Sequence, residues 1–175
     1  MRNLTAAELR SLLDYDAETG VFTWRHRPER TQYDKTWNRR FAGREAGTAQ
    51  RFNTGRWYRA IRVQGRSYLA HRLAFLHMAS TWPPHEIDHR DGDGLNNRWM
   101  NLRAATRSQN GQNSKPTENN TGLKGAHRYK NGRFVAHITA DGRLRHLGYF
   151  DTAEEAHEAY AKAAREHFGD FARVS

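Results

Sequence analysis

The sequence predicts an α+β protein with two folded parts joined by a linker. Residues 85–113 show a strand, loop, strand and helix pattern, with Asp, His and Asn residues near its turns. Further along, Asn131-Gly132 and Asp141-Gly142 favour tight hairpin turns and separate three short strands that precede a helix. Residues 111–122, between the two parts, contain a proline, two glycines and no apolar residue, a composition typical of linkers.

The beginning of the chain predicts two short elements and then a stretch of weak periodicity. Thr5 and Glu8 form a capping-box pattern, which predicts a helix over about 5–14. Gly20 favours a turn into a strand over 21–24. The Gly- and Arg-rich stretch that continues to residue 56 has little apolar periodicity, so we expect it to become ordered only on DNA.

The middle of the chain predicts a hairpin, a helix and the strand pattern already described. Residues 57–63 alternate, Gln64-Gly65 favours a turn, and 67–70 form the returning strand. A helix over 71–78 follows. Thr106 and Gln109 then make a capping box that predicts a helix after the second strand of the 85–113 pattern.

The C-terminal part predicts a three-stranded antiparallel sheet with one helix. We expect strands near 124–129, 133–139 and 144–150, and a helix that starts at the Thr152/Glu155 capping box and ends near Phe168. Strand alternation places Ala136 and Ile138 on the face toward the helix.

The charge of the chain predicts a polyanion as its partner. The net charge is +10, and the stretch from Arg25 to Arg66 holds twelve Arg or Lys against three acids, or +9. Aromatic residues are interleaved with these cations, which suits a surface that contacts phosphates, sugars and bases. The same balance continues at the C-terminus, where 122–149 carries +5 and 151–171 carries −4. The predicted sheet is therefore basic and its helix acidic.

Composition excludes several classes of protein. The chain has no cysteine, so disulfides and cysteine-ligated zinc are ruled out. Its first residues lack the apolar run of a signal peptide, and no apolar stretch approaches the roughly 18 residues of a membrane span. We expect a cytoplasmic protein that does not bind membranes.

Four residues in 85–113 are the candidates for catalysis: Asp88, His89, Asn101 and Asn110. Phosphodiester hydrolysis needs a base that activates water, a metal that steadies the phosphate, and a rigid frame. Histidine is the natural base near neutral pH, and Asp and Asn oxygens suit Mg²⁺ or Mn²⁺. Taken alone, Asp91-Gly-Asp-Gly is a turn rather than a metal loop, and the closing Glu of a calcium EF-hand is missing.

The spacing of these residues resembles the HNH nuclease family, in its phage-type homing-endonuclease branch. The resemblance covers about residues 57–113 and rests on these segments: His71-Arg-Leu-Ala-Phe, Ile87-Asp-His, Asp91-Gly-Asp, Asn96-Asn-Arg, Asn101-Leu-Arg and Ser108-Gln-Asn110. It implies a ββα-metal fold, one divalent ion per active site, and a phage or prophage gene expressed in a bacterial host.

The resemblance also implies roles for individual residues. His89 would be the general base, Asp88 and Asn110 the metal ligands, and Asn101 the residue that fixes the hairpin loop and helps to orient His89. Asn97 and Asn113 would hold the ligands in position. Many relatives have His where this chain has Asn110, which favours Mg²⁺ or Mn²⁺ over zinc or nickel.

His71 has two interpretations. It opens an apolar helix and so fits a packed histidine with one hydrogen bond, but it also fits a residue that supports catalysis.

Residues 122–173 resemble the plant Apetala-two/ethylene-response-factor DNA-binding domain. The segments that carry the resemblance are Gly122-Leu-Lys-Gly-Ala-His-Arg, Gly132-Arg-Phe-Val-Ala-His-Ile and Leu147-Gly-Tyr-Phe-Asp-Thr-Ala-Glu-Glu-Ala. It implies that the sheet lies in the DNA major groove, and the outward positions that would face DNA are Lys124, His127, Tyr129, Arg133, His137, Thr139 and His146. Several of these depart from the Arg and Trp of the plant pattern, so base specificity does not carry over.

The sequence thus predicts four segments: a DNA-gripping segment (1–56), an HNH ββα-metal core (57–113), a linker (114–121) and an Apetala-two-like domain (122–175). The expected activity is metal-dependent cleavage of double-stranded DNA at a homing site. One active site per chain favours nicking unless two chains pair, and the sequence leaves monomer or homodimer open. Two rivals remain: a non-catalytic, transcription-factor-like DNA binder, and a nuclease of recombination or packaging that reads DNA shape.

Overall fold

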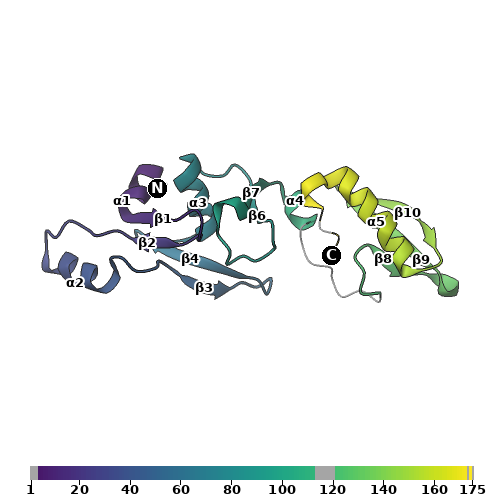
Figure 1. Ribbon diagram of the computed structural model, residues 1–175, viewed down its shortest axis with the longest axis horizontal. Coiled ribbons are helices and arrows are strands. Elements are labelled where there is room, and N and C mark those ends of the chain that lie inside the picture. Colours follow the sequence, from purple (N-terminus) through teal and green to yellow (C-terminus); the bar gives the residue numbers. More distant parts are fainter. Residues whose placement is uncertain (1–3, 113–120, 173, 175) are drawn as a thin grey trace. The chain divides into compact units, whose positions relative to one another are not determined.

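The computed structural model describes residues 4–112, 121–172 and 174, and it divides into two compact units, 1–104 and 105–175 (Figure 1). Helices and strands are mixed in each unit, so the predicted α+β class is confirmed. No helix in the described ranges is long and apolar enough to cross a membrane. Each unit is described here by itself.

The first unit consists of three small sheets and three helices within the described residues. Its elements are α1 (Ala6–Leu12), β1 (Leu13–Tyr15), β2 (Phe22–Trp24), α2 (Gln32–Phe41), β3 (Thr48–Arg51), β4 (Trp57–Val63), β5 (Arg66–Leu69), α3 (Ala70–Ala79), β6 (Glu86–His89), a 3₁₀ turn (Trp99–Asn101) and β7 (Leu102–Ala105). The sheets are β1-β2, β3-β4-β5 and β6-β7.

The helix expected over 5–14 is shorter than predicted. The capping box of Thr5 and Glu8 is present, but the helix ends at Leu12. Leu13 then starts β1, which pairs with β2 in antiparallel register opposite Trp24. The reason is burial, because Leu13 in an extended backbone is fully enclosed beside Leu9 and Phe22.

The stretch with little apolar periodicity contains a regular helix and a strand, and the expectation that it becomes ordered only on DNA stays a prediction. It forms α2, whose own capping box joins Thr31 and Asp34, and β3, which pairs with β4. Its cations lie outside while Ala46 is fully buried.

The first unit has one hydrophobic core that unites residues from both sides of position 56. Leu9 and Phe22 share it with Ile61, Leu73 and Ile87. Neither half has enough apolar residues to enclose a core alone, so the expected border at 56/57 does not coincide with a structural border. The functional assignments given to those ranges stay predictions.

The second unit holds α4 (Arg107–Gln112), β8 (Ala126–Arg128), a 3₁₀ turn (Lys130–Gly132), β9 (Phe134–Ala140), β10 (Arg143–Phe150), α5 (Ala153–Phe168) and a last 3₁₀ turn (Gly169–Phe171). The strands form an antiparallel sheet in the order β10-β9-β8, and their ends lie within two residues of the expected ranges. The linker expected at 114–121 lies outside the described residues except for Thr121, whose hydroxyl donates to Ala126 O at 2.8 Å.

Small residues let α5 lie close on this sheet. Ala136 and Ile138 are buried on the face that contacts Ala156 and Tyr160 of α5, as strand alternation predicted. The closest approach is at Gly125, where a Cβ atom would lie 2.1 Å from the Tyr160 ring. Gly125 also has φ of +78°, so both the lack of space and the backbone conformation require glycine there.

Candidate active site

Strand β6 carries both Asp88 and His89, and both side chains are buried, with 3% and 5% of their surfaces exposed. Adjacent residues of a strand face opposite sides, and these two indeed have different partners. β6 pairs with β7, and Arg90 N donates to Asn101 O at 2.9 Å where the connecting loop closes. The strand pair therefore fixes both side chains on a rigid element.

The carboxylate of Asp88 is held by Arg103 of β7. Arg103 Nε donates to Asp88 Oδ2 at 2.7 Å, and its Nη2 lies 2.7 Å from the same oxygen. Both side chains are almost fully enclosed, so this is a buried ion pair. Sequence reasoning missed Arg103, although a lone charge in the otherwise apolar strand Leu102-Arg-Ala-Ala was a usable signal.

The loop between β6 and β7 is braced by its own polar side chains. Asn101 Nδ2 donates to Asp91 Oδ1 at 3.0 Å and to Asn96 O at 2.7 Å, and its Oδ1 accepts from Asp91 N at 3.1 Å. Asp93 N donates to Asp91 Oδ1, and Leu95 N donates to Asp93 Oδ1, each at 2.9 Å. Asn101 thus holds the loop with both atoms of its amide.

The side chain that contacts His89 is Asn97, which is 2% exposed. Asn97 Nδ2 donates to Leu95 O at 3.0 Å, so its Oδ1 faces His89 Nε2, at 3.4 Å. Because an amide oxygen can only accept, Nε2 carries the proton and Nδ1 is the nitrogen able to take up another. Asn97 therefore selects the tautomer of His89.

The β1-β2 hairpin supports Asn97 from behind. Tyr15 OH donates to Asn97 O at 2.7 Å, and Trp99 N donates to Ala17 O at 2.9 Å. A Cβ atom at Gly20 would lie 2.4 Å from the Asn97 carbonyl carbon, so the two backbones are in direct contact.

Two aromatic rings pack against His89. The His71 ring centroid lies 5.0 Å away at an interplanar angle of 88°, and that of Tyr58 lies 6.0 Å away. Burial lowers the pKa of His71 to about 3, with His89 and Arg72 adding to the shift. His71 Nδ1 is buried without a hydrogen-bond partner, so the single bond expected of a packed histidine is not made at that nitrogen.

Burial also lowers the pKa of His89, against the opposing effects of Asn97 and of Asp91, Asp88 and Asp93. The imidazole is therefore neutral at pH 7, which is the state that a general base needs.

Asn110 lies in α4 of the second unit, and the Thr106/Gln109 capping box that starts this helix is present: Thr106 N donates to Gln109 Oε1 at 2.9 Å. Asp88 lies in the first unit, so the joint metal site of Asp88 and Asn110 stays a prediction. Asn113, the other expected supporting residue, is outside the described residues.

The donor chemistry fits a hard divalent cation, because Asp88 and Asn110 supply carboxylate and amide oxygens. Within the described ranges no group of three or more His, Asp or Glu could hold a metal ion. Two protein ligands are compatible with Mg²⁺, which keeps several of its waters. The Arg103 guanidinium also lies 2.7 Å from the Asp88 carboxylate.

Comparison with known proteins identifies the segment that contains this geometry. Residues 68–112 match the family model described as HNH endonuclease. The matched segment runs from β5 to α4, so it includes His71, Asp88, His89 and Asn110.

Two relatives extend the comparison. An uncharacterized HNH endonuclease, L560, of Acanthamoeba polyphaga mimivirus is 34% identical over 86 residues, which is 49% of this chain and 44% of that protein. The chain therefore matches less than half the length of this relative. This chain is also similar to a solved structure titled "DNA binding and cleavage by the HNH homing endonuclease I-HmuI". The superposition covers 96% of this chain and 91% of that chain, with 18% sequence identity and a TM-score of 0.42.

Three of the residues expected to face DNA lie side by side on the β8-β9-β10 sheet. His127, His137 and His146 form a row, with ring centroids 6.2 and 5.3 Å apart, and Tyr149 adjoins His146 at 4.7 Å. Burial lowers the pKa of His137, and His146 and His127 add to the shift. Tyr149, which is 45% exposed and 4.6 Å from Tyr129, was missed because Gly148 follows an irregularity that shifts the strand register.

The remaining expected positions are less uniform. Thr139 is exposed on β9, while Lys124 precedes β8 and its carbonyl bonds His157 Nδ1 at 2.8 Å. Arg133 lies 3.3 Å from Asp151, so its charge is partly balanced within the chain.

Proposed function

We propose that this protein is a divalent-metal-dependent endonuclease that hydrolyses phosphodiester bonds in double-stranded DNA. The observation that carries the proposal is the environment of His89: a buried neutral imidazole, with its tautomer set by Asn97, one residue from the carboxylate of Asp88. The match of this segment to HNH endonucleases supports the same conclusion.

His89 would take the proton of the attacking water at Nδ1, and the oxygen of that water would form a new bond to phosphorus as the bond between phosphorus and the leaving oxygen breaks. Asp88 and Asn110 would hold Mg²⁺ or Mn²⁺, which supplies charge stabilisation for the phosphate and the leaving oxygen. Asn97 and Tyr58 fix the imidazole, and Arg103 fixes the carboxylate.

We further propose a site-specific homing role with nicking of one strand, and we assign DNA reading to the sheet of the second unit. The likeness of residues 122–173 to Apetala-two/ethylene-response-factor domains and the histidine row on the sheet support this assignment. Two tethered DNA contacts raise the effective concentration of each, so neither needs high affinity alone.

Plasmid cleavage tests the enzymatic proposal. Purified wild type, His89→Ala and a control, His85→Ala, are incubated with supercoiled plasmid in Mg²⁺, in Mn²⁺ and in EDTA. His85 is an exposed histidine of the same domain, which makes it a matched control. We expect nicked product from wild type and His85→Ala with metal only. Equal cleavage by His89→Ala would refute the role of His89, and binding without cleavage of the true target would favour a non-catalytic DNA binder.

A further inference from the structure

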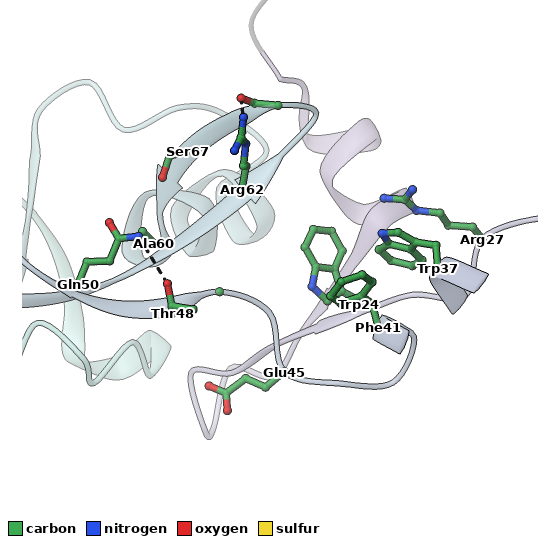
Figure 2. A pocket seen from close by; sticks show the side chains of 12 residues that line it. Trp24, Arg27, Trp37, Phe41, Glu45, Thr48, Gln50, Ala60, Arg62 and Ser67 are labelled. Atoms are coloured by element: carbon green, nitrogen blue, oxygen red, sulfur yellow. Dashed lines mark hydrogen bonds between the residues drawn. The ribbon is translucent and has the colours of Figure 1, made fainter. Parts of the chain in front are cut away.

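The first unit contains an open groove of about 910 Å³ that the catalytic proposal does not use (Figure 2). One wall is aromatic and comes from β2 and α2. The other wall is the outer face of the β3-β4-β5 sheet. The lining includes Trp24, Arg27, Trp37 and Phe41 on the aromatic side and Ala60 and Arg62 on the sheet. A second hollow of about 520 Å³ shares Trp24, Arg27 and Arg62 with it and adds Arg30.

The aromatic wall consists of three packed rings and one guanidinium. Trp24 and Trp37 meet edge to face with centroids 5.5 Å apart, and Phe41 lies 5.3 Å from Trp37. The guanidinium of Arg27 lies over the Trp37 ring at 3.5 Å. All four side chains are only partly buried, so they are open to the groove.

Hydrogen bonds from Asn38 hold this arrangement of side chains in place. Asn38, which is 5% exposed, accepts from Arg27 N and donates to Arg27 O, each at 2.9 Å, and so ties the segment before α2 to that helix. Arg27 Nε is buried without a hydrogen-bond partner. Stacking on Trp37, rather than a hydrogen bond from Nε, therefore positions this guanidinium.

The opposite wall leaves room and adds charge. Its floor consists of small residues such as Ala60, Gly47 and Ser67. Arg62 has no carboxylate within ion-pair distance among the described residues, and its Nε donates to Gly65 O at 3.3 Å. The acid in this wall, Glu45, is paired with Arg59 at 2.8 Å.

From these observations we propose that the groove binds a short unpaired segment of DNA, with bases stacked on the Trp24, Arg27 and Trp37 platform and phosphates beside Arg62 and Arg30. Flat aromatic and guanidinium faces bind bases only when those bases are out of the duplex, whereas phosphates alone would need no aromatic wall. The proposal rests on the proposed DNA substrate, and it adds that one strand is locally separated in the complex.

The test measures binding without cleavage, in EDTA and on the His89→Ala background. Fluorescein-labelled single-stranded oligo-dT and a duplex of equal length are titrated by anisotropy. Trp37→Ala is the test variant, and Tyr33→Ala is the control, because Tyr33 is a 67%-exposed aromatic of the same helix outside the groove lining. We expect Trp37→Ala to weaken single-strand binding by about 5- to 150-fold, the range for loss of one stacked base, with less than about a twofold change for duplex. Equal loss for both DNAs, or no loss, overturns the proposal.

A second measurement does not depend on the stability of the variant. Oligo-dT with one 5-iododeoxyuridine is photocrosslinked to the His89→Ala chain and the adducts are mapped by mass spectrometry. Adducts on Trp24, Trp37 or Phe41 support the groove, and adducts only at residues outside it overturn it. If plasmid cleavage fails while these adducts form, only the enzymatic proposal falls; if cleavage succeeds and the adducts lie elsewhere, only the groove proposal falls.

Discussion

The carboxylate of Asp88, which we propose as a metal ligand, also takes part in a buried ion pair that stabilises the first unit. It is buried in the first unit and carries its own counter-charge in Arg103. Taking a carboxylate out of water costs several kcal/mol unless a cation compensates, so the fold depends on this partner. The stability of the strand pair β6-β7 and the position of the Asp88 carboxylate are thus linked through Arg103.

Removal of Arg103 should therefore destabilise the first unit strongly. We expect Arg103→Met to lower the free energy of unfolding by about 3–5 kcal/mol, because Asp88 is left as an unpaired buried charge. Urea denaturation monitored by tryptophan fluorescence measures the loss. The double variant Asp88→Asn/Arg103→Met should regain much of it, and a double variant no more stable than the single one would contradict the explanation.

His71 should make the stability of the protein sensitive to acid. Its pKa is about 3 in the folded chain and near 6.5 in the unfolded chain. Between these values only the unfolded chain binds the proton, so its stabilising contribution is complete above pH 6.5 and declines as the pH falls toward 3, by at most about 1.4 kcal/mol per pH unit. Urea denaturation at pH 7, 6 and 5 should give a shallower decline for His71→Phe. If the free energy of unfolding fell equally with pH in wild type and His71→Phe, His71 would not be the source of the acid sensitivity.

At the scale of elements, the contact between α5 and its sheet depends on Gly125. Gly125→Ala would place a methyl group inside the Tyr160 ring, as well as straining a positive φ. Gly132→Ala is the matched control, since Gly132 has φ of +76° with nothing within 4 Å of its Cβ position. We expect hydrogen exchange in β8 to β10 to accelerate far more in Gly125→Ala than in Gly132→Ala, while β4 and β5 stay protected. Equal acceleration would show that only backbone strain matters.

The outer face of the same sheet offers a second test at this scale. If His146 and Tyr149 contact DNA, replacement of either by Ala should weaken duplex binding by up to about tenfold, the upper value for one hydrogen bond. Lys162→Ala is the control, because Lys162 is an exposed cation on α5, away from that face. Electrophoretic mobility shift at fixed salt gives the comparison, and an equal effect of Lys162→Ala would indicate general charge attraction only.

The sequence predicted most elements because their signals are local. The predicted capping boxes at Thr5, Thr106 and Thr152 start three helices, and the expected hairpin turns at Gln64 and Asp141 have positive φ. What could not be predicted depends on long-range contacts. The order of α2 and β3 comes from packing on β2 and β4, which no periodicity in that stretch records.

The candidate site divides in the same way. Asp88, His89, Asn97 and His71 were identifiable by residue type and spacing, and their burial agrees with a constructed site. The partners of these residues were not, since Arg103 and Tyr58 reach Asp88 and His89 only through strand pairing and tertiary packing. Asn97 rather than Asn101 contacts His89, because Asn101 bonds the loop with both atoms of its amide.

At the scale of the whole molecule, charge dominates behaviour. With a net charge of +10, the chain should release counterions on binding DNA, so its affinity should fall steeply with salt. We expect a slope of log affinity against log salt of about −0.9 per phosphate neutralised, and Arg30→Gln should reduce its magnitude by about 1. Anisotropy with a duplex at several salt concentrations measures both, and a flat response would refute phosphate contacts by this region.

The support that the β1-β2 hairpin gives to Asn97 has a consequence for anyone who wishes to shorten this chain. A fragment that started at residue 57 would keep every residue of the matched segment 68–112. It would nevertheless lose Tyr15, Ala17 and Gly20, which hold the backbone around Asn97 from the other side. A fragment that keeps the surroundings of Asn97 therefore has to include the β1-β2 hairpin, well before the first residue of the matched segment.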